Sequence, residues 1–290
     1  MKRTLPEPSP IADQVAKHRS ALSPRRQEIL SPIFDNPKEF VLLSVRACAE
    51  RLQTDSAFLL RVVQQLGFAS YGDFKKYLHD LSLSNATTYE RMQQTGGSSS
   101  SLDNVLDASL RGGIENLQAL EATLDRARLV ALSRRMHAAR RILILGGDLS
   151  GAVGEYLQYQ LTMLGLSPQL LRSTGEMIHA VRSVEKQDVV IGITFRRGLR
   201  CTVDALREAR QRGAHCAAIT NAASSAAARY SDDVFLAGIE GSSLRSTFVA
   251  PFALIDVLVA ACANVKRRKV LKLMSEASDE QVNGYRWFQD

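Results

Sequence analysis

The chain has 290 residues, of which 45% are hydrophobic and 23% are charged, so its composition is globular and its length is about twice that of one domain. Its 37 Lys and Arg exceed its 30 Asp and Glu, and the formal net charge of +7 permits a polyanionic partner without indicating which half would meet it. The sequence has no apolar run of 18 residues or more and no secretory leader, so we expect a cytoplasmic protein without a membrane partner.

Residues 1–92 carry only helix signals, and we expect them to form an all-α domain. Ser23-Pro24 is an N-cap and first-turn pair, and Asn36-Pro37 and Gly67 separate short amphipathic segments. A Gly/Ser-rich stretch at 93–101 cannot bury enough apolar surface to become ordered, and it predicts a linker to a second domain at 102–290.

Within the first domain, residues 44–66 predict two short helices joined by a tight turn. Apolar residues recur at i, i+4 and i+7 from Val45, and at i, i+3, i+4 and i+7 from Leu59. Asp55 is the expected N-cap of the second helix and Gly67 its left-handed stop. This pattern is typical of a helix-turn-helix, in which the second helix lies in the major groove of DNA.

The outward face of that second helix supplies the candidate DNA contacts. Arg and Gln side chains make paired hydrogen bonds to guanine and adenine edges, and a Ser at a helix start binds phosphate. The predicted DNA-binding residues are Ser56, Ala57, Arg61, Gln64, Gln65 and, in the following helix, Lys75. A small helical bundle with a polar surface would show the same periodicity, so the pattern leaves both interpretations open.

After residue 101 the period changes, and a helical stretch at about 103–139 leads into apolar runs that alternate with amphipathic stretches. This alternation predicts a parallel sheet in a three-layer αβα sandwich, with a ligand at the carboxyl ends of the strands. The expected strands are 142–145, 169–172, 189–194, 216–220 and 234–237. The expected helices between them are 151–164, 176–184, 202–212 and 225–230, and a buried helix is expected within 247–265.

Candidate ligand residues follow two of the expected strands. Gly146–Gly151 is a glycine turn that opens a helix and presents free N–H groups to an anion. Asp148 replaces the middle glycine of a dinucleotide motif, which argues against a nicotinamide cofactor. Arg196 and Arg197, after the strand that ends at Thr194, are able to clamp a phosphate or carboxylate, or else to pair with Asp148, Glu176 or Asp204 and stabilise the fold.

The four cysteines and the acidic and histidine residues give no catalytic or metal pattern. Cys48, Cys201, Cys216 and Cys262 are widely spaced, and free thiols are expected. Glu176 and His179 are spaced as surface residues of a helix or as a metal half-site, and the first interpretation is favoured. Glu155 and Glu240 are the other candidates for a general base, but none falls in a catalytic pattern, so we expect neither enzyme activity nor a cofactor or metal.

The stretch from Arg61 to Leu78, RVVQQLGFASYGDFKKYL, resembles the R-F-x-x-x-L-G-F-x-G-Y-x-x-F-K-x-x-L segment of RpiR-type transcriptional regulators. This resemblance implies a helix-turn-helix domain joined to a sugar-isomerase-type (SIS) domain that senses a phosphorylated sugar. The chain departs from the family at Asp55 and Phe58, where Ser and Thr are usual. Asp55 repels a nearby phosphate, and Phe58 is either a core residue or an unusual groove contact.

The second domain resembles the SIS domain, which agrees with the resemblance of the first domain to RpiR-type regulators. Gly146–Gly151 is similar to the first motif, G-x-G-x-S-G, and Thr194 lies in the place of the first hydroxyl of the second motif, S-x-S-G-x-T. The resemblance implies effector contacts from Gly147, Ser150, Thr194, Arg196 and Arg197. Residues 212–221 and 225–232 are similar to later segments of the same domain.

These observations together predict a homodimeric or homotetrameric transcriptional regulator that binds double-stranded operator DNA. We expect it to repress carbohydrate metabolism genes under the control of a sugar phosphate or related anion. The alternative from another class is a sugar-phosphate isomerase with an accessory helical domain.

Overall fold

The computed structural model describes residues 15, 18–19, 21–84, 101–196, 198–241 and 246–283. The chain divides into two compact units, Met1–Ser99 and Ser100–Asp290. Arg197 and, apart from Ser101, the expected linker at 93–101 lie outside the described residues.

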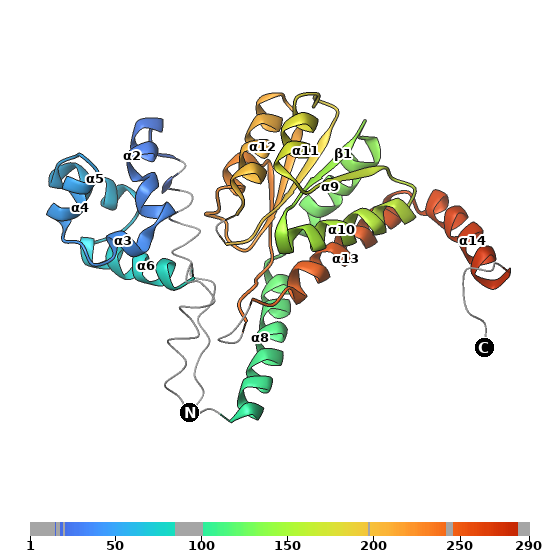
Figure 1. Cartoon of the computed structure of the whole chain (residues 1–290), viewed down its shortest axis with the longest axis horizontal. Coiled ribbons are helices and arrows are strands. Elements are labelled where there is room, and N and C mark those ends of the chain that lie inside the picture. The colour runs from blue at the N-terminus through green and yellow to red at the C-terminus, as the bar shows by residue number, and fades with distance from the viewer. Residues whose placement is uncertain are drawn as a thin grey trace. The chain divides into compact units, whose positions relative to one another are not determined.

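The described part of the first unit is all helical, as the sequence predicts (Figure 1). A fully buried Phe74 lies at the centre of its core, and the rings of Phe34 and Phe68 meet it edge-on at centroid distances of 6.5 and 5.3 Å. The helices are α2 (Pro24–Asp35), α3 (Pro37–Phe40), α4 (Val45–Arg51), α5 (Ser56–Gln65) and α6 (Tyr71–Ser84).

The second unit is built on a five-stranded parallel sheet with the strand order β2-β1-β3-β4-β5. Its strands are β1 (Ile142–Leu145), β2 (Pro168–Leu171), β3 (Val189–Ile193), β4 (His215–Thr220) and β5 (Asp233–Leu236). The prediction is correct for β1 and within one residue at each end for the other four. Near-continuous burial of β1 and β3 shows that both faces of the sheet are covered.

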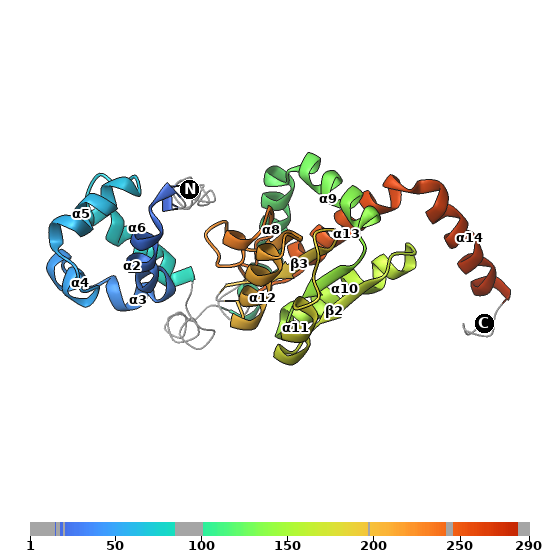
Figure 2. The same cartoon turned by 90° about the horizontal axis from the view of Figure 1, so that it is seen from above.

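Helices cover the two faces of the sheet as separate layers, so the predicted three-layer αβα sandwich is confirmed (Figure 2). Helices α11 and α12 pack on one face, and α9, α10 and α13 pack on the other. The helices of this unit are α8 (Leu102–Thr123), α9 (Arg126–Ala138), α10 (Asp148–Met163), α11 (Thr174–Val181), α12 (Arg200–Gln211), α13 (Val249–Val265) and α14 (Arg267–Asn283).

Several expected helix boundaries are wrong, mostly because a capping residue starts the helix at a position that the apolar pattern does not indicate. The stretch at about 103–139 is two helices, since Asp125 caps α9 by accepting a hydrogen bond from the Arg128 N–H at 2.9 Å. Helix α11 begins at Thr174 because Ser173 and Glu176 form a capping box. The segment expected as a helix at 225–230 contains only a 3₁₀ turn, Ala228–Tyr230.

Helix α14 was not expected from the sequence, and it follows α13 after a sharp bend. Within the described ranges, one pair of helices together meets the length and composition criteria for a membrane span. This pair is α13 and the first turns of α14, and the chain bends by 105° between them. No single described helix meets those criteria.

The strand order reverses between β1 and β3. From β1 the chain passes to β2 on one side, and from β3 it passes to β4 on the other. In open parallel sheets this reversal opens a crevice at the carboxyl ends of the two strands, where ligands bind.

Candidate functional site

The turn after β1 is a close-packed glycine corner at the first side of this crevice. Gly147 is the N-cap of α10, and because it has no side chain, no side-chain hydrogen bond caps the first turn of that helix. A Cβ at Gly147 would collide with Leu199 and lie 3.2 Å from the carbonyl oxygen of Arg172. The corner thus leaves backbone N–H groups and the positive end of α10 directed at the crevice, as an anion site requires.

Ser150 and Asp148 lie in that first turn in different environments. Ser150 is half-buried, whereas Asp148 is exposed and has a left-handed backbone, with φ at 49°. The guanidinium of Arg172, at the end of β2, lies against the same turn, since its Nε is 3.2 Å from where a Cβ at Gly151 would be. Arg172 also pairs with Glu155 at 3.3 Å, so a cation already lies beside the turn.

The loop after β3 forms the second side of the crevice. Thr194 is buried, and its hydroxyl lies beneath Gly198, where a Cβ would be 2.5 Å from Oγ1. Arg196 has a φ of 56°, and its backbone N–H donates to Oδ1 of Asn221 at 2.7 Å. Asn221 follows β4, so a side chain from the next strand fixes the left-handed residue of this loop.

The structure thus brings four of the five predicted ligand residues to the point where the strand order reverses. Gly147 and Ser150 come from the β1 side and Thr194 and Arg196 from the β3 side, while Arg197 lies outside the described residues. The sequence analysis missed Arg172 and Asn221. Asn221 directly follows an expected strand and Arg172 is the last residue of another, so an amide or cationic residue at a strand end was the available signal.

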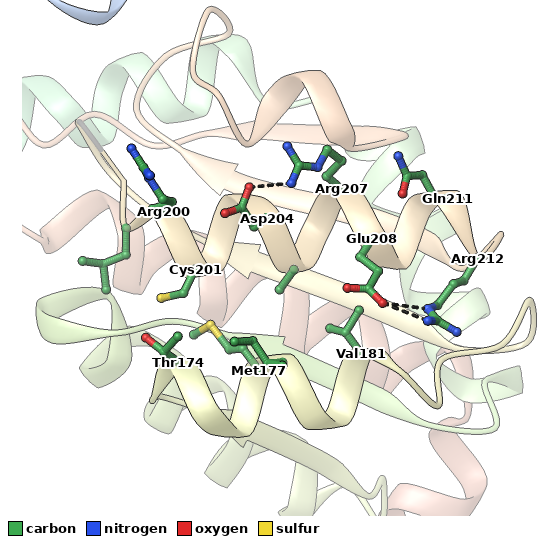
Figure 3. Close-up of a pocket in the computed structure, with 13 residues that line it drawn as sticks. Thr174, Met177, Val181, Arg200, Cys201, Asp204, Arg207, Glu208, Gln211 and Arg212 are labelled. Carbon is green, nitrogen blue, oxygen red and sulfur yellow. Dashed lines mark hydrogen bonds and ion pairs between the residues drawn. The ribbon is translucent and has the colours of Figure 1, made fainter.

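A groove of about 720 Å³ lies nearby, between α11 and α12, and it contains none of the predicted ligand residues (Figure 3). Met177 and Ala205 lie at its base, and Arg200 and Thr174 lie at the end where both helices begin. Its rim holds the ion pairs Asp204–Arg207 and Glu208–Arg212, each at 2.8 Å. Leu199 lines the groove and also covers Gly147, so groove and crevice share one side chain.

Among the candidate acid–base residues, Glu176 and Glu155 take part in local interactions, and His179 is exposed. Oε2 of Glu176 accepts hydrogen bonds from the N–H groups of Ser173 and Arg172, both at 2.8 Å, and these bonds hold the pKa of Glu176 below its ordinary value. A general base near neutral pH needs a raised carboxyl pKa instead. The described residues contain no cluster of three metal-ligating side chains, and the ring of His215 forms a hydrogen bond with the Asp233 carboxylate at 2.8 Å.

The helix-turn-helix forms as predicted in the first unit. Asp55 caps α5 by accepting a hydrogen bond from the Phe58 N–H at 2.6 Å, and Gly67 ends the helix region with a φ of 94°. Leu59 is fully buried, while Phe58 is half-buried and packs against the core rather than standing clear of it.

The predicted DNA contacts lie on the accessible side of α5. Ala57, Arg61, Gln64 and Gln65 are exposed, Ser56 is half-exposed, and Lys75 of α6 is half-buried. Gln65 accepts a hydrogen bond at 3.0 Å from Arg26 of α2, a residue that the sequence analysis missed. Arg26 therefore adds a cation beside the polar face of α5.

Comparison with known proteins agrees with both units. Residues 135–261 match the family model of the SIS domain, so the second unit contains a SIS domain. An RpiR transcription factor from Sphaerobacter thermophilus, solved as its sugar isomerase domain, is similar with a TM-score of 0.56 at 26% identity, over 59% of this chain and 96% of that chain. The Vibrio vulnificus NanR protein complexed with ManNAc-6P is similar in fold, with a TM-score of 0.57 at 19% identity, over 94% of this chain and 98% of that one.

A relative known from its sequence extends the similarity over the first unit. An uncharacterized HTH-type transcriptional regulator of Caldanaerobacter subterraneus is 22% identical over 267 residues, which cover 90% of this chain and 93% of the relative. The resemblance to RpiR-type transcriptional regulators is thereby confirmed: the chain joins a helix-turn-helix unit to a SIS domain.

Proposed function

We propose that this chain is a sequence-specific DNA-binding regulator, a repressor of carbohydrate metabolism genes, whose SIS domain binds a phosphorylated sugar or related anion. The convergence of Gly147, Ser150, Thr194 and Arg196 on the crevice between β1 and β3 carries the proposal. Free N–H groups, hydroxyls and a guanidinium are the groups that hold a phosphate. The ManNAc-6P bound by a protein of the same fold supports this ligand class.

In this proposal α5 reads the operator and a pair of chains places two such helices on half-sites about one DNA turn apart. Arg61 and Gln64 contact base edges, while Ser56, Lys75 and Arg26 contact phosphates. The effector changes operator affinity because it binds one arrangement of the paired DNA-binding units more tightly than the other.

The DNA part is tested by fluorescence anisotropy with duplexes from the promoter beside the gene. We expect Arg61→Ala and Gln64→Ala each to weaken specific binding by about 5- to 150-fold, corresponding to about 1–3 kcal/mol per paired base contact. Arg128→Ala, which removes an exposed cation from the other unit, is the matched control and leaves affinity unchanged. Equal loss in all three variants, or no binding by the wild type at low salt, contradicts the proposal.

The effector part is tested by thermal shift with inorganic phosphate and with hexose and pentose phosphates, each beside its unphosphorylated sugar. A phosphorylated sugar is expected to raise the melting temperature and to change DNA affinity. Ser150→Ala and the double variant Arg196→Ala, Arg197→Ala lose both responses, whereas Arg134→Ala, at an exposed position of α9, keeps them. Interconversion of aldose and ketose phosphates by the pure protein would favour the isomerase alternative.

A further inference from the structure

The described part of the loop that joins β5 to α13 contacts both the crevice and helix α8. On the crevice side, the ring of Phe248 meets the ring of Phe195 edge-on, at a centroid distance of 5.3 Å and an interplanar angle of 82°. Phe195 is buried and lies in the loop after β3, between Thr194 and Arg196, which are proposed to bind the effector. A movement of these two residues around a ligand therefore acts on Phe248 through the ring pair.

On its other side, the same loop lies close against the second half of α8. Asn116 of α8 donates a hydrogen bond from Nδ2 to the carbonyl oxygen of Glu240 at 2.6 Å. A Cβ at Gly112 would lie 3.4 Å from that oxygen, and a Cβ at Gly113 would lie 3.6 Å from Cγ2 of Val249, the first residue of α13. The two glycines thus let the helix approach the loop without a side chain between them.

Asn116 is a buried amide that belongs to neither the crevice nor the helix-turn-helix. It is 8% exposed, and a Cβ at Gly238 would lie 2.5 Å from its Oδ1, so the backbone of the loop encloses it. A buried amide is costly unless it is hydrogen-bonded, and its bond to Glu240 forms only where the two groups face each other. Asn116 therefore specifies the position along the loop at which α8 docks, as a buried polar side chain specifies the register of a helix pair.

A backbone hydrogen bond completes a continuous route from the crevice to α8. The N–H of Thr247, the neighbour of Phe248, donates to the carbonyl oxygen of Ile239 at 3.2 Å. Ile239 immediately precedes Glu240, so a displacement of Phe248 reaches the carbonyl group that Asn116 binds. Packed interiors change between discrete arrangements rather than deforming gradually, and a shift at one end of this route is therefore passed to the other.

Helix α8 is placed to pass such a shift to the DNA-binding unit. It is the first helix of the second unit, and the chain reaches it from the helix-turn-helix unit. Figure 1 shows the first turns of α8 extending away from the sheet of their own unit. A displacement of its docked half therefore displaces the point at which the chain arrives from the first unit.

We infer that Phe195, Phe248 and Asn116 are positioning residues, which couple occupation of the crevice to the docking of α8 and thereby to operator affinity. The inference rests on the proposed function, because it names the route by which the effector acts on the DNA-binding unit. Coupling between two sites is reciprocal. A change at Asn116 must therefore be felt in the loop after β3, although the hydrogen bond of Asn116 goes to Glu240.

The first test needs no ligand and measures hydrogen exchange of the full chain by mass spectrometry. Phe248→Leu and Asn116→Ala are each expected to speed exchange by about fivefold or more in both the second half of α8 and the loop after β3. Phe252→Leu is the matched control, because it breaks a similar edge-on ring pair of α13, at 5.4 Å, whose partner Tyr156 belongs to α10. It leaves exchange in both regions unchanged.

Two results of the exchange experiment overturn the inference. One is a local effect, in which Asn116→Ala speeds exchange in α8 alone or Phe248→Leu speeds it in the loop after β3 alone. The other is an equal acceleration in α11 and α12 on the opposite face of the sheet, because the variants then loosen the whole unit instead of one route.

The second test measures operator affinity by fluorescence anisotropy, with and without the sugar phosphate that gives the largest thermal shift. In the wild type this compound is expected to change the operator Kd by about 5- to 150-fold. Phe248→Leu reduces that change to less than about twofold, whereas Phe248→Tyr, which keeps the ring, and Phe252→Leu retain it. All three variants keep the thermal shift, since neither aromatic residue is among those proposed to bind the effector.

The outcomes separate the inference from the proposed function. An undiminished response in Phe248→Leu overturns the inference alone, because effector and operator are then coupled by another route. A wild type whose operator affinity responds to no sugar phosphate overturns the effector part of the proposed function, and the inference with it.

Discussion

The replacement of Asp188 with asparagine is a stringent test of how the residues just before β1 and β3 are held together. Its carboxylate is fully buried and accepts hydrogen bonds from Nε and Nη2 of Arg140 at 3.0 and 2.7 Å. Nη2 of Arg141 and the N–H of Glu185 donate to the same carboxylate, both at 3.0 Å. Asp188→Asn keeps the shape of the side chain and removes its charge.

The expected loss of stability follows from the burial of the two sides of this ion pair. Breaking a buried ion pair by removing one partner costs about 3–5 kcal/mol. The arginine side chains here are 40 and 31% exposed, so water takes over part of the lost interaction and about 2–3 kcal/mol remains. For a unit of this size that corresponds to a fall in melting temperature of about 4–12 °C.

The assay is thermal unfolding of wild type and variant between pH 3 and 8, with Asp204→Asn as the control. Asp204 pairs with Arg207 at a similar distance but on the surface, so its loss costs at most about 1 kcal/mol. Equal losses for Asp188→Asn and Asp204→Asn would refute the reasoning, because burial would then add nothing to the ion pair.

The difference between wild type and Asp188→Asn should also depend on pH. Burial raises the pKa of the Asp188 carboxyl, but the hydrogen bonds from Arg140, Glu185 and Arg141 outweigh it and leave the pKa below its ordinary value. A lowered folded-state pKa means that the carboxylate contributes its full stability above the unfolded-state pKa of about 3.9. That contribution is lost as the pH falls through the folded-state pKa, so the difference is constant from pH 8 to about 5 and narrows below pH 4.

Three further outcomes are expected. Leu59→Ala removes a fully buried side chain from the helix-turn-helix core and costs about 2–5 kcal/mol, so operator binding is lost on mild heating, whereas Leu60→Ala at a site 39% exposed has little effect. Gly192→Ala places a Cβ 2.8 Å from Cγ of Leu206 and is expected to lower the free energy of unfolding, measured with denaturant, by about 1–3 kcal/mol. Gly175→Ala in α11 is neutral or stabilising, because no atom beyond its chain neighbours and its own helix backbone lies within 4 Å of the added Cβ. Thr220→Val replaces a buried hydroxyl that has no hydrogen-bond partner among the described residues, and its melting temperature is unchanged or higher; a lower one would show that the hydroxyl is satisfied.

Much of the αβα fold was predictable because buried parallel strands leave a plain signal in the sequence. The strand 142–145 is correct to the residue, since an uninterrupted apolar run ends at a glycine. Helix starts were less well predicted. The first turn of α10 is Asp-Leu-Ser-Gly, which has no apolar periodicity, and only the backbone of Gly147 shows that the helix begins at Asp148.

The glycine and hydroxyl residues of the candidate site were predictable from the sequence. The prediction was incomplete for the charged and amide residues beside them. The resemblance to the two SIS motifs pointed to Gly147, Ser150 and Thr194, and the structure places each of them after a strand. Asn221 was missed since its role is to bind the backbone of Arg196, a partner 25 residues away that only the sheet register brings near. The same kind of long-range pairing joins Arg26 to Gln65 in the other unit.

Two adjacent glycines lie in α8 at the boundary between its docked and its projecting turns. Gly112 and Gly113 allow the helix to approach the backbone at Glu240 and the side chain of Val249, yet each weakens a helix interior by about 1 kcal/mol relative to alanine. Thermal fluctuation should therefore divide α8 at this pair: its leading turns exchange amide protons quickly in a lone chain, whereas the turns beyond it retain theirs as long as the sheet does.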